Sequence, residues 1–159
     1  MHQAYLLLGS NLGDRDQIFI QAIESLATLG RVLAVSGRYE TAAWGRRDQP
    51  GFLNQALLLQ TVLEPSLLLD SILSIERQLG RERKERYGPR TIDIDILLYD
   101  DLIVQTEKLL IPHPELPNRR FALTALTEIA PNYLHPEKNQ SIQELLLNCS
   151  DPLPVHLLS

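Results

Sequence analysis

Residues 92–98, which read Ile-Asp-Ile-Asp-Ile-Leu-Leu, restrict the fold of this chain more than any other stretch. Successive side chains of a β-strand point to opposite faces, so this alternation predicts a strand. Because its flanks are rich in isoleucine, we expect the strand to lie in the centre of a sheet rather than at an edge. One face would carry Ile92, Ile94, Ile96 and Leu98, and the other would carry Thr91, Asp93 and Asp95.

Asp93 and Asp95 are two like charges side by side, an unfavourable arrangement unless a cation lies between them. Mg²⁺ is a hard cation that prefers carboxylate oxygens and keeps positions open for water and phosphate. A solvated strand face with alternating acids is the alternative, and the spacing alone is compatible with both interpretations. The apolar flanks favour an acid pair that faces a cleft, and therefore a magnesium site.

A loop rich in arginine and lysine comes just before this strand, in a chain whose formal net charge is −5. Arginine makes charged, two-pronged hydrogen bonds to phosphate oxygens. Each cation by itself is typical of a solvated loop, whereas the set suits a mobile lid that closes over phosphates. The cations are Arg81, Arg83, Lys84, Arg86 and Arg90.

Glu76 and His113 each have two interpretations. Glu76 borders the apolar stripe of a predicted helix, where an ordinary surface acid is the simpler interpretation and a contact to a ribose hydroxyl is the other. His113 lies between two prolines that hold its backbone stiffly, just before Arg119 at a predicted helix start. The two residues form either a helix-capping cluster or a phosphate site. Trp44, Phe52 and Phe121 are either core residues or stacking partners for a flat ring.

Length and composition favour one cytoplasmic domain over residues 1–159. The negative charge argues against general nucleic-acid or membrane-surface binding, and no apolar run is long enough for a membrane span. Cys149 is the only cysteine, which excludes an internal disulfide and fits a reducing compartment. Residues 9–13 lack the Gly-Lys that would complete a P-loop.

Hydrophobic periodicity and turn residues predict the order βαββαβ, the ferredoxin-like pattern of helices on an antiparallel sheet. We therefore expect an α+β fold, extended to an α/β/α sandwich, with an irregular tail after Asp151. Predicted strands cover residues 3–9, 31–40 (with Gly37 a bulge), 52–62, 92–98 and 102–104. Predicted helices cover 14–29, 65–79 and 118–129, and a capping box of Ser141 and Glu144 begins a last helix.

The residues alone thus indicate a Mg²⁺-dependent enzyme that acts on a nucleotide polyphosphate. Taken together, the motifs also resemble one family, the 6-hydroxymethyl-7,8-dihydropterin pyrophosphokinases of folate biosynthesis. The resemblance runs from Ala4 to about Pro136 and depends on an ordered set of motifs. These are Gly9-Ser10-Asn11-Leu12, Asp48-Gln49-Pro50, Phe52-Leu53-Asn54, Ile75-Glu76, Gly80-Arg81, residues 88–95, Pro112-His113, Asn118-Arg119 and Phe121.

The resemblance implies transfer of pyrophosphate from ATP to the pterin hydroxymethyl group, with release of AMP. By the family pattern Asp93 and Asp95 would hold two Mg²⁺ ions, and Arg81 and Arg90 would contact the phosphates. The ATP site would comprise Glu76, Arg81, Arg83, His113 and Arg119. The pterin site would comprise Thr41, Ala42, Trp44, Phe52, Asn54, Tyr87 and Phe121, with Phe52 and Phe121 on either side of the ring.

The sequence departs from the family pattern at a few positions. Tyr87 stands where family members carry Trp, Lys108 replaces an Arg, and Pro114 replaces a Tyr. Residues 42–44 replace a segment richer in proline. Two other functions remain open: a different Mg²⁺-dependent nucleotide transferase on the same fold, and a non-catalytic ligand-binding module. We expect a monomer that binds small molecules only.

Overall fold

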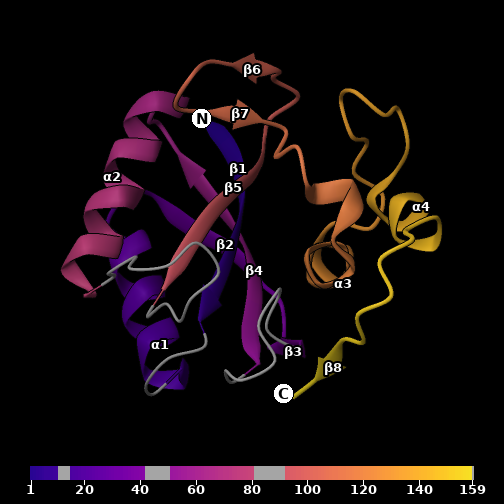
Figure 1. The fold of residues 1–159 in the computed structure, drawn as a ribbon. Helices are drawn as coiled ribbons and strands as arrows, with labels where there is room; N and C mark the ends of the chain where they lie inside the picture. Colours follow the sequence, from indigo (N-terminus) through magenta and orange to yellow (C-terminus); the bar gives the residue numbers. More distant parts are fainter. Residues whose placement is uncertain (11–14, 42–50, 81–91, 159) are drawn as a thin grey trace.

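The computed structural model describes residues 1–10, 15–41, 51–80 and 92–158. A sheet lies between two layers of helices (Figure 1). Helices α1 (Arg15–Leu26) and α2 (Pro65–Gln78) cover one face, and α3 (Arg120–Ile129) and α4 (Ile142–Leu147) lie on the other side. This arrangement confirms the predicted α+β sandwich. Among the described residues, no helix has both the length and the apolar character needed to cross a membrane.

The main sheet has the strand order β5-β1-β4-β3-β8, with β2 also paired to β4, and every pairing is antiparallel. If β2 and β3 are counted as one interrupted strand, the chain order is the predicted βαββαβ. The strands are β1 (His2–Ser10), β2 (Arg31–Val35), β3 (Tyr39–Thr41), β4 (Phe52–Thr61), β5 (Asp93–Tyr99) and β8 (His156–Leu157).

The prediction of one strand over residues 31–40 is wrong in detail, because the strand is interrupted between β2 and β3. Ser36 lies in the break, where its backbone N–H donates to the carbonyl of Ala56 and its Oγ accepts from the N–H of the same residue. The N–H of Gly37 donates to Glu128 of α3 at 2.9 Å. Side-chain partners thus replace part of the strand ladder, and the break joins the sheet to α3.

The second half of the chain also differs from the predicted elements. The tail is not irregular throughout, since β8 pairs with the outer edge of β3. The strand expected over 102–104 is β6 (Val104–Gln105), which pairs with β7 (Leu110–Ile111) in a small separate sheet. A 3-10 turn, Leu116–Asn118, precedes α3, and the predicted capping box of Ser141 and Glu144 is present at α4.

Two apolar clusters, one on each side of the main sheet, follow the alternation of its strands. Leu6 and Leu8 of β1 pack in the cluster with α1 and α2, and Tyr5 and Leu7 pack in the cluster with α3 and α4. In β5 the predicted alternation holds as far as Ile96. A register shift opposite Tyr5 and Leu6 then puts Leu97 and Leu98 into one cluster, so the predicted face of Leu98 is wrong.

Strand β5 lies at the edge of the described sheet, which contradicts the expected central position. Its side chains are buried in the two apolar clusters, and two hydrogen bonds satisfy backbone groups of this edge strand. The N–H of Ile94 donates to Glu76 of α2, and the carbonyl of Leu97 accepts from the N–H of His113 at 2.9 Å. Because a helix side chain and a neighbouring segment satisfy these backbone groups, an edge strand has the apolar composition of a central one.

Candidate active site

Four residues from four strands form a row across the sheet, on the face that α3 covers. Gly9 of β1 lies opposite Asp93 of β5 on one side and opposite Asn54 of β4 on the other. Asn54 in turn lies opposite Tyr39 of β3. Directly opposite residues of antiparallel strands point to the same face. The row therefore places the first aspartate and the predicted pterin residue Asn54 on one surface.

Gly9 separates Asp93 from Asn54 and has no side chain to fill the gap. A Cβ atom at this position would lie 3.3 Å from Oδ1 of Asn54, closer than most such contacts. Neighbouring strands are about 4.8 Å apart, so the backbones of Asp93 and Asn54 are roughly 10 Å apart. Only the backbone of Gly9 therefore separates the amide-bearing residue from the carboxylate-bearing one along this row.

Asn54 has a hydrogen-bonding capacity that the fold does not use. Its side chain is 3% exposed, and among the described residues its Nδ2 has no hydrogen-bond partner. A buried donor without a partner costs about 1–3 kcal/mol, so native proteins rarely keep one unless something else binds there. The orphaned amide is therefore a candidate contact for a ligand with an acceptor atom.

Asp95 follows Asp93 on the same face of β5, in the next row, opposite Leu7 of β1. Both carboxylates are half-buried, whereas Ile94 between them is buried in the cluster with α1 and α2. Residues two apart in a strand lie about 7 Å apart, a separation that lets two carboxylates share hard cations. Within the described ranges, no group of three or more His, Cys, Asp or Glu could hold a metal ion.

Glu76 of α2 is only 4% exposed, and its Oε2 accepts a hydrogen bond from the N–H of Ile94 at 2.7 Å. It is therefore neither the ordinary surface acid nor a residue remote from the acid pair. The bond holds the backbone of β5 between Asp93 and Asp95. The sequence indicated Glu76 as a candidate, and the structure gives it this contact.

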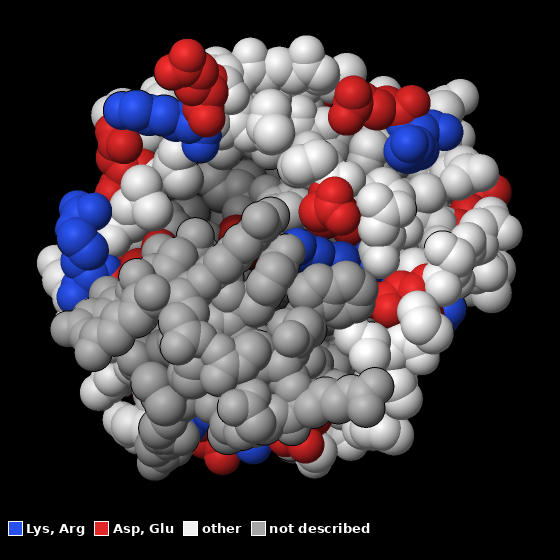
Figure 2. Space-filling view, viewed as in Figure 1, with Lys and Arg blue, Asp and Glu red and all other residues white. Residues whose placement is uncertain are grey.

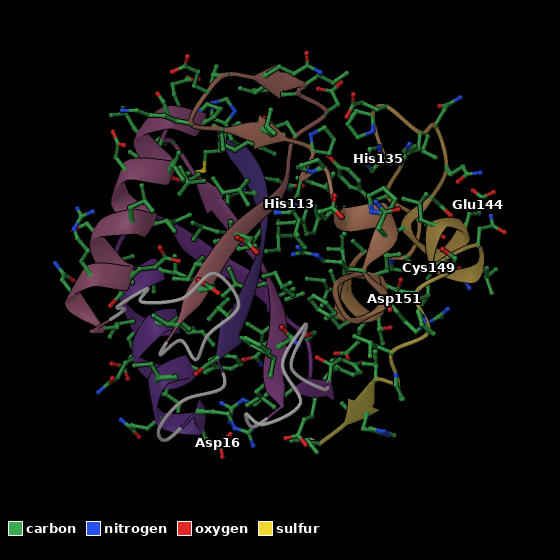
Figure 3. All side chains as sticks on the ribbon, in the orientation of Figure 1. Asp16, His113, His135, Glu144, Cys149 and Asp151 are labelled. Carbon is green, nitrogen blue, oxygen red and sulfur yellow. The ribbon has the colours of Figure 1, made fainter. Side chains whose placement is uncertain are left out.

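His113 lies beside β5 on the segment that leads to α3 (Figure 3). Its Nδ1 accepts a hydrogen bond from the N–H of Glu115 at 3.2 Å. Burial lowers the pKa of His113, an effect that Asp95 opposes and Arg119 reinforces. The neutral ring therefore carries its proton on Nε2, which leaves an N–H donor in the neighbourhood of Asp95.

The aromatic residues predicted to stack on a ring lie on the same side of the sheet. Phe52 is two residues before Asn54 in β4 and so shares its face, and Phe121 belongs to α3, which covers that face. The guanidinium of Arg119 lies 5.9 Å from the centre of the Phe121 ring, a cation–π contact. Phe52 is paired with Thr41 across the β3–β4 ladder.

The structure places five of the predicted site residues on the sheet face that α3 covers: Asp93, Asp95, Asn54, Phe52 and Thr41. Phe121 belongs to α3, and Arg119 and His113 lie just before it, whereas Glu76 reaches the edge of β5 from α2 on the other side. The remaining predicted residues lie outside the described residues: Arg81, Arg83, Tyr87, Arg90, Ala42 and Trp44. In the face shown in Figure 2, acidic and basic side chains are interspersed over the described surface. Sequence reasoning assigned no role to Gly9, because its position between two strands is a property of the register and not of the local sequence.

A family model described as 7,8-dihydro-6-hydroxymethylpterin-pyrophosphokinase (HPPK) matches residues 5–131. The pyrophosphokinase of Aquifex aeolicus, named for 2-amino-4-hydroxy-6-hydroxymethyldihydropteridine, is 43% identical over 91% of this chain and 90% of its own. The enzyme of the same name from Methylorubrum extorquens is 49% identical over 83% of this chain and 85% of its own length. This chain belongs to the HPPK family.

The HPPK family membership confirms the resemblance drawn from the motifs and makes the chain a pyrophosphokinase of folate biosynthesis. Solved structures agree on the fold. The HPPK-DHPS protein of Plasmodium falciparum, solved with pteroate, superposes with a TM-score of 0.73 at 18% identity. That match covers 92% of this chain and 42% of the longer one, so this chain spans less than half of that protein.

Proposed function

We propose that this chain transfers pyrophosphate from ATP to 6-hydroxymethyl-7,8-dihydropterin. The hydroxymethyl oxygen forms a bond to the β-phosphorus of ATP, and the bond from that phosphorus to the oxygen bridging the α-phosphorus breaks. AMP leaves, and the hydroxyl proton passes to water. The row of Asp93, Gly9 and Asn54 supports this proposal, since it puts a candidate metal ligand and an orphaned amide on one face of the sheet with only a glycine between them.

Asp93 and Asp95 are the residues that would hold two Mg²⁺ ions. Bound Mg²⁺ supplies charge neutralisation for the polyphosphate. Two half-buried carboxylates on one face of β5 fit hard, oxygen-seeking cations. Phosphoryl-type transfer has a loose transition state, so positioning and charge matter more than a strong base. The absence of an obvious base from the sequence motifs is consistent with this chemistry.

His113 and Arg119 are proposed to bind the ATP phosphates. The Nε2–H of a neutral His113 donates a hydrogen bond to a phosphate oxygen without the full repulsion of a second cation beside Arg119. Arg119 adds the fixed positive charge. The remaining proposed ATP contacts follow the family pattern: Glu76, Arg81 and Arg83, with Arg81 and Arg90 acting in catalysis.

Asn54 is proposed to hold the pterin through the amide that the fold leaves unused. Phe52 on β4 and Phe121 on α3 would contact the two faces of the ring, which offset stacking stabilises by about 0.5–1.5 kcal/mol for each aromatic pair. Thr41, Ala42, Trp44 and Tyr87 complete the proposed pterin site. We further propose that the chain works as a single cytoplasmic domain and as a monomer.

A coupled assay with ATP, Mg²⁺ and the hydroxymethyl dihydropterin tests the proposed reaction. We expect AMP and the pterin diphosphate in equal amounts, with none formed when EDTA replaces Mg²⁺. ADP as the nucleotide product would contradict pyrophosphate transfer and favour a different transferase on the same fold. Binding of both small molecules without turnover would favour a non-catalytic module.

A further inference from the structure

Arg15, the first residue of α1, joins three segments of the fold. Its Nη1 donates to Oε2 of Glu40 at 2.9 Å and to the carbonyl oxygen of Gly51 at 3.0 Å. Glu40 belongs to β3, and Gly51 immediately precedes β4. A guanidinium carries five donors in a rigid fork, so one side chain serves a carboxylate and a carbonyl together. Arg15 thus fixes the ends of two paired strands to one helix.

The two strand ends are packed tightly at this point. A Cβ atom on Gly51 would lie 2.5 Å from the carbonyl oxygen of Thr41 and 3.3 Å from Cγ of Glu40. Only glycine allows the backbone to pass this close. The carbonyl that Arg15 binds is therefore part of the closest approach between the two segments, and a small displacement there moves both of them.

Two residues proposed to hold the pterin come directly after these strand ends in the sequence. Thr41 is next to Glu40 in sequence, and Phe52 is next to Gly51. Thr41 and Phe52 lie opposite each other in the ladder, and Asn54 lies opposite Tyr39. Thr41, Phe52 and Asn54 are therefore each within three positions of a residue that Arg15 binds.

We propose that Arg15 is a positioning residue for the acceptor site, holding the β3–β4 end at the separation that the flat substrate needs. The inference deepens the proposed function and depends on it. Among the described residues, Arg15 makes no hydrogen bond to a proposed substrate contact, and it acts through Glu40 and Gly51. The side chains of Arg15 and Glu40 are 28% and 39% exposed, and such ion pairs add little to stability. Removing the Arg15 side chain should therefore lower pterin affinity more than it lowers the stability of the fold.

The chain offers a matched control. Arg38, the residue just before β3, donates from Nη1 to Oδ1 of Asp16 at 2.7 Å, so a second ion pair joins α1 to the start of β3. Figure 3 shows Asp16 at the lower edge of the molecule and His113 near its centre. Asp16→Asn removes this ion pair without touching Gly51, and it separates a general loss of packing from a specific effect on the acceptor site.

The test measures three quantities for wild type, Arg15→Gln, Glu40→Gln and Asp16→Asn. These are the Kd of the pterin by fluorescence in the presence of a non-hydrolysable ATP analogue, the Kd of that analogue, and the Tm. For Arg15→Gln we expect the pterin Kd to rise roughly tenfold, as for the loss of a directed charged hydrogen bond. The analogue Kd and Tm should stay close to wild type. Glu40→Gln should have a smaller effect because the Gly51 bond remains, and Asp16→Asn should have none.

Arg15→Lys provides a second measurement if the glutamine variant does not fold. An ammonium lacks the planar fork, so we expect an intermediate loss of pterin affinity. Unchanged pterin affinity in the arginine variants would overturn the inference, as would equal losses of pterin, analogue and Tm. Wild type that forms no AMP would instead contradict the proposed function, so the two failures are distinguishable.

Discussion

Glu76 accepts a hydrogen bond from the backbone of Ile94, at 2.7 Å, and so joins helix α2 to the strand between the two aspartates. The acceptor and the donor are both buried. Because β5 lies at the edge of the described sheet, a helix side chain accepts the hydrogen bond that a neighbouring strand would otherwise accept. The position of the acid pair therefore depends on a contact 18 residues away in the sequence.

Glu76→Ala should destabilise the protein and weaken metal binding. The alanine variant lacks the carboxylate that accepts from the buried N–H of Ile94. Losing this hydrogen bond should lower the free energy of unfolding by about 1–3 kcal/mol. Urea unfolding measures the stability, and Mn²⁺ titration followed by electron paramagnetic resonance, with the ATP analogue present, measures the metal affinity. Glu76→Gln keeps an acceptor oxygen and should retain most of the stability. Wild-type stability in the alanine variant would show that this hydrogen bond is dispensable.

Asp93→Ala or Asp95→Ala should lower AMP formation by at least about a hundredfold at saturating Mg²⁺, because charge on the polyphosphate is then poorly neutralised. The fold should remain, as judged by circular dichroism and Tm. Asp101→Ala, at an exposed acid just beyond the same strand, is the control and should keep full activity. Near-normal turnover in either strand variant would rule out the two-metal assignment.

Gly9→Ala should weaken pterin binding and leave ATP-analogue binding unchanged. The new methyl group would lie 3.3 Å from Oδ1 of Asn54 and would press on that side chain. A double-mutant cycle with Asn54→Ala identifies the cause, since neighbouring residues show non-additive effects. If the methyl group acts by displacing Asn54, its effect on the pterin Kd should shrink in the Asn54→Ala background. Strict additivity would show that Gly9 acts by another route.

Stability should fall as the pH drops below about 6.5, the ordinary pKa of histidine, in part through His135. This side chain is buried, and its Nδ1 accepts from the N–H groups of Glu137 and Lys138 at 3.1 Å. Burial lowers the pKa of His135; Glu137 opposes this effect and Lys138 adds to it, so on balance the folded state favours the neutral ring. The unfolded chain takes up the proton first as the pH falls, and stability is then lost.

Urea midpoints at pH of about 7.5 and about 5.5 measure this loss. His135→Asn has no titrating group and should show a smaller difference between the two midpoints. His156→Gln, at an exposed position in β8, should behave as wild type. If His135→Asn kept the whole difference, the acid sensitivity would have to come from other groups, such as His113.

The sequence alone predicted the helices and most of the strands, because hydrophobic periodicity is a local property. The stripe of α2 and the capping box of α4 each need only a few neighbouring residues. The predictions failed at elements whose formation depends on residues far away in the sequence. The break between β2 and β3 depends on Ala56 and Glu128, and β8 forms because the edge of β3 is available to it.

The candidate site divides in the same way. Alternation in residues 92–96 was enough to put Asp93 and Asp95 on one face, and the family motifs named Asn54 and His113. The register of three strands decided that Gly9 separates Asp93 from Asn54, and helix packing decided that Glu76 covers an edge strand. These relationships join residues tens of positions apart. They depend on hydrogen bonds and packing that exist only after the chain has folded, so the sequence determined the chemistry available and the tertiary structure decided its arrangement.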